Sequence, residues 1–197
     1  MLKNQPEYQM ETGPESDAVI LVKRGRLGAV VAKEQVLSQA ELSQLDWQGR
    51  TAVMVVGEYI LLSGHLSSKK EKNEANVRQM KQSLQGIVAA HPGHHIICGA
   101  DVNSYLQKWE EGLHVYPSDN SQPTTLKKRT HAQVQRKKAE VVSGESKDAI
   151  ISTLPIIEGA IRTMEGGWPE TSTFLPLDQH PFDHFLVAAE LQLFNGK

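Results

Sequence analysis

Residues 58–101 constrain the fold most, because they show the pattern of a strand, a long helix and a second strand. Two apolar runs, EYILLSGH (58–65) and HHIICGAD (94–101), enclose a segment, 68–90, whose apolar residues recur with the 3.6-residue period of a helix. These helical positions are Val77, Met80, Leu84, Ile87 and Val88. Pro92-Gly93 ends the helical pattern. A strand–helix–strand unit predicts a layered α/β domain.

Further short apolar runs predict strands on both sides of this unit. They are AVILVK (18–23), Gly28–Ala32, TAVMVV (51–56), DAIIST (148–153), Ile156–Ile161 and HFLVAAELQLF (184–194). We expect the strand at 148–153 to pair with the one at 156–161 across Leu154-Pro155. The polar segment 117–147 is expected to be mostly loop. Residues 1–17 are expected to be a flexible N-terminal lead-in, and residues 18–197 a single domain.

Composition excludes several classes of protein. The chain has 197 residues and one cysteine, Cys98, which rules out an internal disulfide framework and a Cys-rich zinc module. No run approaches the roughly 18 apolar residues of a membrane span. The first residues form no apolar signal-peptide core, so we expect an intracellular protein, in the cytoplasm or nucleus, that is not secreted. A net charge of −2 does not by itself indicate a nucleic-acid binder.

Polar residues with catalytic or metal-binding potential stand at the ends of the expected strands. They are His65, Asp101, Asn103, Asp148, Asp183 and His184. Strand ends of a layered α/β domain open onto a shared cleft, so these side chains can form one site. Aspartate and asparagine oxygens suit Mg²⁺, and Mn²⁺ as a substitute, whereas histidine can act as a general base or stabilise an oxyanion.

Each of these residues also has an ordinary structural interpretation. His65 can be a partly buried histidine at a strand end, and Asp101 with Asn103 fits an Asx turn. Asp148 can be a solvated acid, and Asp183-His184 an ordinary turn. A second histidine group surrounds Pro92-Gly93 at the opposite end of the strand–helix–strand unit, and there a solvated loop is the favoured reading. This group is His91, His94 and His95.

Taken together and in order, four of these segments resemble the motifs of the endonuclease/exonuclease/phosphatase superfamily, which includes DNase I and exonuclease III-type nucleases. The four segments are SGHLSS (63–68), IICGADVNS (96–104), SKDAIIST (146–153) and PFDHFLVAAEL (181–191). The resemblance covers residues 18 to 192. It implies a DNase I-like β-sandwich flanked by helices, in αββα layers, and magnesium-dependent attack of water on a phosphoester.

The resemblance implies a role for each matching residue. His184 would contact the scissile phosphate, and Asp183 would orient it or bind the metal. Asp101 would activate or orient the attacking water, with Asn103 fixing the phosphate or the metal. His65 would stabilise the phosphate oxygens, and Asp148 would support the site.

The N-terminal part departs from the family pattern. The family's opening strands, which carry a metal-binding glutamate, should precede the strand at 18–23 by a wide margin, but here 17 residues precede it. We therefore expect a sandwich that is truncated at its N-terminus. Glu11, within YQMET (8–12), is the residue that could match the metal glutamate. If Glu11 cannot reach Asp101 and Asp183, a catalytically dead binding protein becomes the alternative.

A basic stretch bears on the substrate. Between Asp119 and Glu140 the chain has no acidic residue, and several basic residues precede Asp148 there. The candidate substrate-binding residues among them are Lys127, Lys128, Arg129, Arg136 and Lys137. They can contact the phosphates of DNA or RNA, or can simply form a solvated loop. We expect a nuclease-type phosphodiesterase that acts on nucleic acid, with a phosphoinositide or sphingolipid phosphoesterase, which would take a phosphorylated lipid headgroup, as the alternative.

Overall fold

The computed structural model describes nine stretches of the chain. They are residues 7–15, 18–47, 50–67, 69–103, 112–118, 124–128, 142–145, 147–162 and 186–192. Their centre is a six-stranded sheet in the order β3-β4-β5-β6-β10-β7. Its strands are β3 (Val30–Val31), β4 (Thr51–Val56), β5 (Tyr59–His65), β6 (His95–Asp101), β7 (His114–Tyr116) and β10 (Asp148–Ser152).

The neighbours β5 and β6 are parallel, and the long helix α2 (Lys70–Ala90) connects them. The other neighbouring strands of this sheet are antiparallel. Parallel neighbours need a crossover connection, and a helix is the usual one. The sequence prediction of a strand, a helix over 68–90 and a second strand is therefore confirmed within two residues at the helix start.

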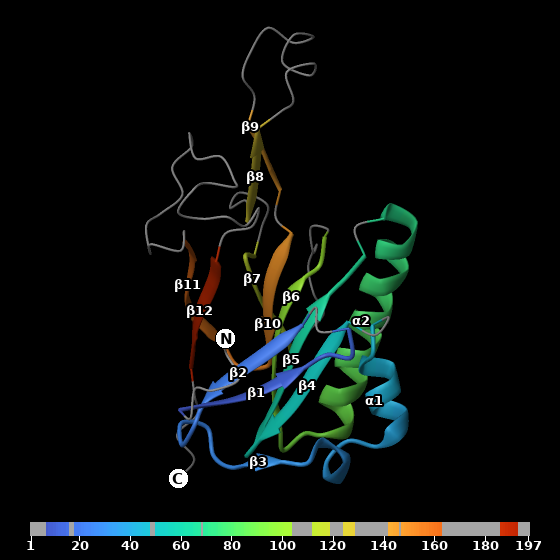
Figure 1. The fold of residues 1–197 in the computed structure, drawn as a ribbon, viewed down its shortest axis with the longest axis vertical. Helices are drawn as coiled ribbons and strands as arrows, with labels where there is room; N and C mark the ends of the chain where they lie inside the picture. Colours follow the sequence, from blue (N-terminus) through green and yellow to red (C-terminus); the bar gives the residue numbers. More distant parts are fainter. Residues whose placement is uncertain are drawn as a thin grey trace, which may run out of the picture.

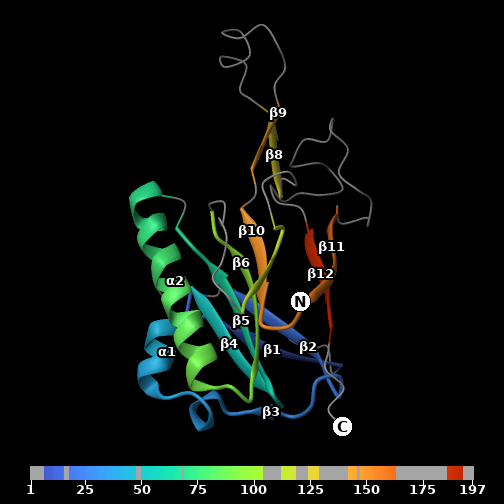
Figure 2. The same cartoon turned by 180° about the vertical axis from the view of Figure 1, so that it is seen from behind.

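Both α-helices cover one face of the main sheet, as Figures 1 and 2 show from opposite sides. Helix α1 (Gln39–Leu45) follows the short 3₁₀-helix η2 (Lys33–Gln35) and packs beside α2. The apolar face of α2 meets alternate residues of the strands in a buried core. Members of this core include Trp47, Val53, Val55, Ile60, Met80, Leu84, Ile87 and Cys98. No described helix is long and apolar enough to cross a membrane.

Two small antiparallel sheets pack on the other side of the main sheet. They are β1 (Tyr8–Thr12) with β2 (Val19–Lys23), and β11 (Ile156–Arg162) with β12 (Leu186–Leu191). A second buried cluster joins β2 to the remaining faces of β4 and β5 and includes Ile20, Val22, Met54, Leu61 and Leu154. The described residues thus form three of the four expected layers: helices, main sheet and second sheet layer.

Two expectations from the sequence are wrong. Residues 8–12, expected within the flexible lead-in, form β1, because pairing with β2 at a sheet edge tolerates polar side chains. The strand at 148–153 does not pair with 156–161; β10 pairs with β6 and β7, whereas β11 pairs with β12. Within 117–147, expected to be mostly loop, the structure describes two short strands, β8 (Thr125–Lys128) and β9 (Val142–Glu145), while most of the segment lies outside the described residues. These two strands form a ribbon that projects beyond the main sheet (Figure 1), so they need no apolar alternation.

Gly64 lies next to His65 at a point where the strand touches the core. A Cβ atom at Gly64 would come within 2.6 Å of the Trp47 ring, which is fully buried. We therefore expect Gly64→Ala to lower the free energy of unfolding by about 1–3 kcal/mol, as overpacked core sites do. Chemical denaturation measures this change.

The matched control is Gly99→Ala on the adjacent strand β6, where an added Cβ meets nothing within 4 Å. It should leave the free energy of unfolding within about 1 kcal/mol of the wild-type value. Equal losses in Gly64→Ala and Gly99→Ala would contradict the packing described for Trp47.

Candidate active site at the ends of three strands

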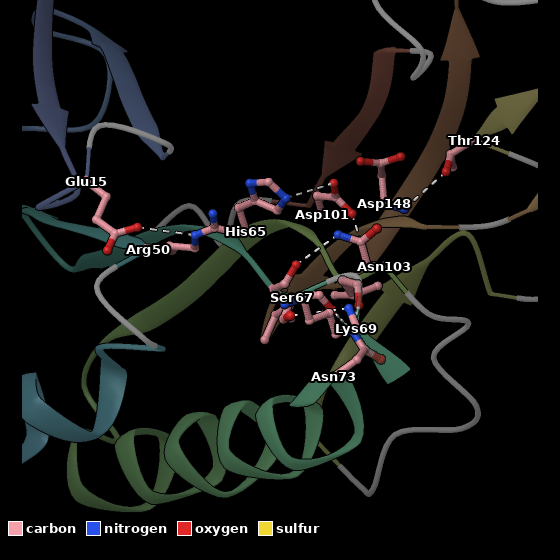
Figure 3. A network of polar contacts seen from close by, with 12 residues as sticks. Glu15, Arg50, His65, Ser67, Lys69, Asn73, Asp101, Asn103, Thr124 and Asp148 are labelled. Atoms are coloured by element: carbon pink, nitrogen blue, oxygen red, sulfur yellow. Dashed lines mark hydrogen bonds and ion pairs between the residues drawn. The ribbon is translucent and has the colours of Figure 1, made fainter. Parts of the chain in front are cut away.

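Three neighbouring strands bring polar residues to one end of the main sheet. In the parallel pair of β5 and β6, His65 lies opposite Asp101. In the antiparallel pair of β6 and β10, Asp148 at the start of β10 lies opposite the same Asp101. Figure 3 shows these three side chains side by side, with Asn103 next to them. The strand ends therefore bring His65, Asp101, Asn103 and Asp148 together, and their predicted roles stay predictions.

His65 and Asp101 face each other across the strand pair. The Nε2 atom of His65 lies 3.6 Å from Oδ2 of Asp101, and the side chains are 38% and 22% exposed, respectively. A backbone hydrogen bond joins the ends of β5 and β6, because the Leu66 N–H donates to the Asp101 carbonyl at 2.8 Å. Both polar side chains thus remain accessible to a substrate while their strands are held.

Asn103 closes a tight turn after β6. Its backbone has a φ of 48°, in the left-handed region that asparagine tolerates better than most residues. Its N–H donates to Oδ1 of Asp101 at 2.9 Å, and its Nδ2 donates to the Leu66 carbonyl at 2.8 Å. The Asx turn considered from the sequence is therefore present. The same turn places the carboxylate of Asp101 next to the side-chain amide of Asn103.

Asp148 is positioned by a residue that the sequence analysis did not identify. The hydroxyl oxygen of Thr124, which is fully buried, accepts from the N–H groups of Lys147 and Asp148 at 2.8 and 3.1 Å. In addition, the Val102 N–H donates to the Lys147 carbonyl at 2.7 Å. The start of β10 is thus tied both to the turn after β6 and to the base of the β8–β9 ribbon. A threonine within a polar stretch gives no sequence signal for this role.

Glu15 and Arg50 were also missed, and they lie beside His65 (Figure 3). Nε of Arg50 is 3.4 Å from a carboxylate oxygen of Glu15, and the Arg50 carbonyl accepts from the His65 N–H at 3.2 Å. A signal for Arg50 existed in the sequence. It directly precedes the strand at 51–56, and an antiparallel pairing with 58–65 places it opposite His65.

The structure does not bring Glu11 to this cluster. Glu11 lies on β1, and its Oε1 accepts from Nζ of Lys33 at 2.8 Å. It borders a cavity of about 310 Å³ together with Val53 and Val55, in the middle of β4, whereas His65 lies level with the start of that strand. The assignment of Glu11 as a metal ligand thus gains no support from this geometry.

Several predicted site residues fall outside the residues that the structure describes. These are Asp183, His184, Arg129, Arg136 and Lys137. For Lys127 and Lys128 the structure gives the backbone, in β8, but not the side chains. Their predicted roles stay predictions.

The donor set suits an oxygen-seeking divalent cation. Asp101, Asp148 and Asn103 offer oxygens, and Mg²⁺ commonly takes one or two protein carboxylates with water completing its shell. Within the described parts of the chain, no group of three or more His, Cys, Asp or Glu side chains could hold a metal ion. A complete site would therefore draw on further residues, for which the sequence analysis named Asp183.

Two other chemistries find no support: metal binding by the histidines around Pro92-Gly93, and nucleophilic attack by the Cys98 thiol. Nε2 of His91 lies 2.8 Å from a carboxylate oxygen of Glu41, so His91 joins α1 to the end of α2. Burial raises the pKa of the Cys98 thiol to about 12, because the charged thiolate would lose its hydration. Cys98 is therefore not a nucleophile near neutral pH.

The described layers and strand order form an α/β sandwich, as the sequence analysis expected. No protein-family model and no curated protein matches the sequence, whereas solved structures match its fold. A truncated TDP2 from Caenorhabditis elegans has a TM-score of 0.56 at 16% identity, covering 93% of this chain and 75% of that chain. A longer C. elegans TDP2 chain is covered over 58% of its length.

Two further structures show the same likeness. TDP2 from D. rerio, complexed with a single-strand DNA product, has a TM-score of 0.56 at 17% identity, covering 95% of this chain and 78% of that chain. The endonuclease domain of TRAS1, a telomere-specific non-LTR retrotransposon, has a TM-score of 0.55 at 13% identity, with coverages of 96% and 82%. These matches show that this chain has the DNase I-like fold of TDP2 and of the TRAS1 endonuclease domain.

The role of Thr124 can be tested with a nearly isosteric change. Thr124→Val removes the oxygen that accepts from Lys147 and Asp148, so we expect the free energy of unfolding to fall by about 1–3 kcal/mol. Hydrogen exchange at these two amides should also quicken, and NMR can measure it residue by residue.

Thr153→Val is the matched control. The Thr153 hydroxyl accepts from the Ile96 N–H at 3.0 Å, just past the other end of β10. This variant should lose comparable stability without faster exchange at Asp148. Unchanged exchange at Asp148 in Thr124→Val would refute the positioning role.

Proposed function

We propose that this chain is a metal-dependent phosphodiesterase that hydrolyses nucleic acid. The observation that carries the proposal is the meeting of His65, Asp101, Asn103 and Asp148 at one end of three adjacent strands. The shared fold supports it, since one structural neighbour was solved with a single-strand DNA product and another is an endonuclease domain. Fold alone does not determine activity, so the residues of the site carry the functional assignment.

In the proposed reaction, water attacks the phosphorus atom, a P–O ester bond breaks, and the leaving oxygen takes up a proton from solvent and departs as an alcohol. Asp101 is placed to take the proton of that water, because Oδ1 is engaged by the Asn103 N–H while Oδ2 faces His65. Nε2 of His65 would donate to a phosphate oxygen and stabilise the charge that develops there. The predicted roles of Asp183 and His184 complete this scheme, with His184 contacting the scissile phosphate.

Asp148, with Asp183 from the predicted set, would hold Mg²⁺ or Mn²⁺. Such an ion supplies Lewis-acid polarisation of phosphoryl oxygens and lowers the pKa of bound water. Asn103 would orient a phosphate or the metal through its side-chain amide. Thr124 would keep Asp148 in place through the two backbone groups described above.

Basic residues around the cluster favour a polyanionic substrate. Arg50, Lys69 and Lys147 lie at the same end of the sheet as Asp101. The β8–β9 ribbon starts directly after Thr124 and projects beyond the main sheet (Figure 2), and Lys127 and Lys128 belong to its strand β8. Several basic residues near a hydrolytic centre suit the successive phosphates of DNA or RNA better than a single lipid headgroup.

A non-catalytic nucleic-acid-binding protein is the second candidate. The ion pair of Glu11 with Lys33 favours this candidate, because Glu11, the glutamate predicted to bind the metal, contacts a lysine away from the cluster. Cations of the ribbon and of the strand ends would bind phosphates in either case. The two candidates therefore differ in turnover rather than in binding.

The test is the hydrolysis of labelled single-stranded DNA and RNA, and of a phosphoinositide and sphingomyelin, with Mg²⁺, with Mn²⁺ or with EDTA. We expect cleavage of an oligonucleotide that requires the metal. Asp101→Asn should reduce kcat by roughly 100-fold or more, because it removes the proton acceptor. His65→Ala should cause a loss of similar order, because it removes a donor to the phosphate.

The matched controls carry the same changes outside the cluster. These controls are Asp46→Asn and His114→Ala. Asp46 lies at the end of α1, and His114 is exposed on β7. Both should retain wild-type kcat. Binding of oligonucleotide without cleavage would support the non-catalytic candidate, and cleavage of only the lipid substrates would overturn the choice of nucleic acid.

A further inference from the structure

A buried asparagine on helix α2 connects the two loops that carry the candidate site. Asn73 lies in the first turn of α2 and is 5% exposed. Its Nδ2 donates to the Ser67 carbonyl at 2.9 Å and to the Val102 carbonyl at 2.6 Å. Ser67 follows β5 by two residues and Val102 follows β6 directly, so one side-chain amide holds both strand exits (Figure 3).

The chemistry of this contact requires an amide. A primary amide nitrogen has two hydrogens, and Asn73 uses one for each carbonyl. Both carbonyls lie just beyond the strands, where the main sheet no longer supplies donors, and a buried carbonyl left unpaired is unfavourable. Carboxylate or hydroxyl replacements of similar size cannot donate to both carbonyls.

The two carbonyls belong to the segments that position the site. Ser67 lies two residues after His65, and Val102 lies between Asp101 and Asn103. These segments are also bonded to each other through Leu66, which donates to Asp101 and accepts from Asn103. Asn73 adds a connection from these segments to α2.

Helix α2 is itself firmly packed, which makes it a fixed point for the two loops. Its side chains Met80, Leu84 and Ile87 are at most 1% exposed. Moving either loop relative to α2 would break a hydrogen bond of Asn73. The site geometry thus depends on the helix as well as on the strands.

We propose that Asn73 is a positioning residue of the candidate site. It holds His65 and the turn from Asp101 to Asn103 at their mutual distance by bonding to both loops, and it does not touch the substrate. This proposal rests on the proposed hydrolytic function for its kinetic consequence, but its structural consequence can be measured without any substrate.

The first test compares Asn73→Asp with the wild-type protein. The variant has nearly the same shape, but its carboxylate faces two carbonyl oxygens and donates to neither. With a cleaved oligonucleotide we expect kcat to fall by about 100-fold, the scale of a small misplacement of catalytic groups. KM should change much less, because Asn73 makes no substrate contact. Hydrogen exchange at the Leu66 and Asn103 amides should quicken, whereas exchange at Ile60 should not.

Ser83→Ala is the control for a loss of stability alone. Ser83 is buried further along α2, and its hydroxyl accepts from Nε1 of Trp47 at 3.1 Å. This variant should lower the melting temperature while keeping wild-type kcat and wild-type exchange at Leu66. If Asn73→Asp does not fold, Asn73→Ser, which retains one donor, takes its place and should show the same changes to a smaller extent.

The outcomes separate the positioning role from the hydrolytic function. Wild-type kcat in a folded Asn73 variant, or an equal loss of kcat in Ser83→Ala, would overturn the positioning role. If the wild-type protein cleaves none of the substrates, the hydrolytic function fails and hydrogen exchange alone decides. Faster exchange at Leu66 and Asn103 would then support the role of Asn73, and unchanged exchange would overturn it.

Discussion

The register between β5 and β6 is the constraint on which the rest of the site depends. Parallel pairing places the last residues of both strands, His65 and Asp101, opposite each other at the same edge of the sheet. Helix α2 makes this pairing topologically accessible and buries the strands on that face. Because β10 runs antiparallel to β6, its first residue, Asp148, reaches the same edge. A shift of one residue in any of these pairs would turn a polar side chain to the opposite face.

Much of this arrangement could be predicted from the sequence, because it depends on local patterns. The period of 3.6 in 68–90, bounded by two apolar runs, predicted α2 and its flanking strands. Polar residues directly after apolar runs predicted that His65, Asp101 and Asp148 would meet. The Asx turn of Asp101 with Asn103 followed from the same residues, and in the structure it forms part of the site.

Other parts could not be predicted, because they depend on contacts between distant segments. Thr124 and Asn73 act through hydrogen bonds to backbone groups of remote strand ends, and such bonds leave no local pattern. The partner of β11 is β12 rather than β10, a choice made by packing between layers. Glu11 matched a motif in its immediate neighbours, yet in the fold it lies beside Lys33.

Paramagnetic broadening by Mn²⁺ in the NMR spectrum of the ¹⁵N-labelled protein tests directly whether a metal ion binds at the ends of these three strands. Substoichiometric Mn²⁺ broadens signals of nuclei near the bound ion. We expect the amide signals of Asp101, Asn103 and Asp148 to disappear first, and we expect Asp148→Asn to weaken the effect. Broadening centred on His91 and His94, or an even loss of intensity across the spectrum, would contradict a metal-binding site at the ends of these three strands.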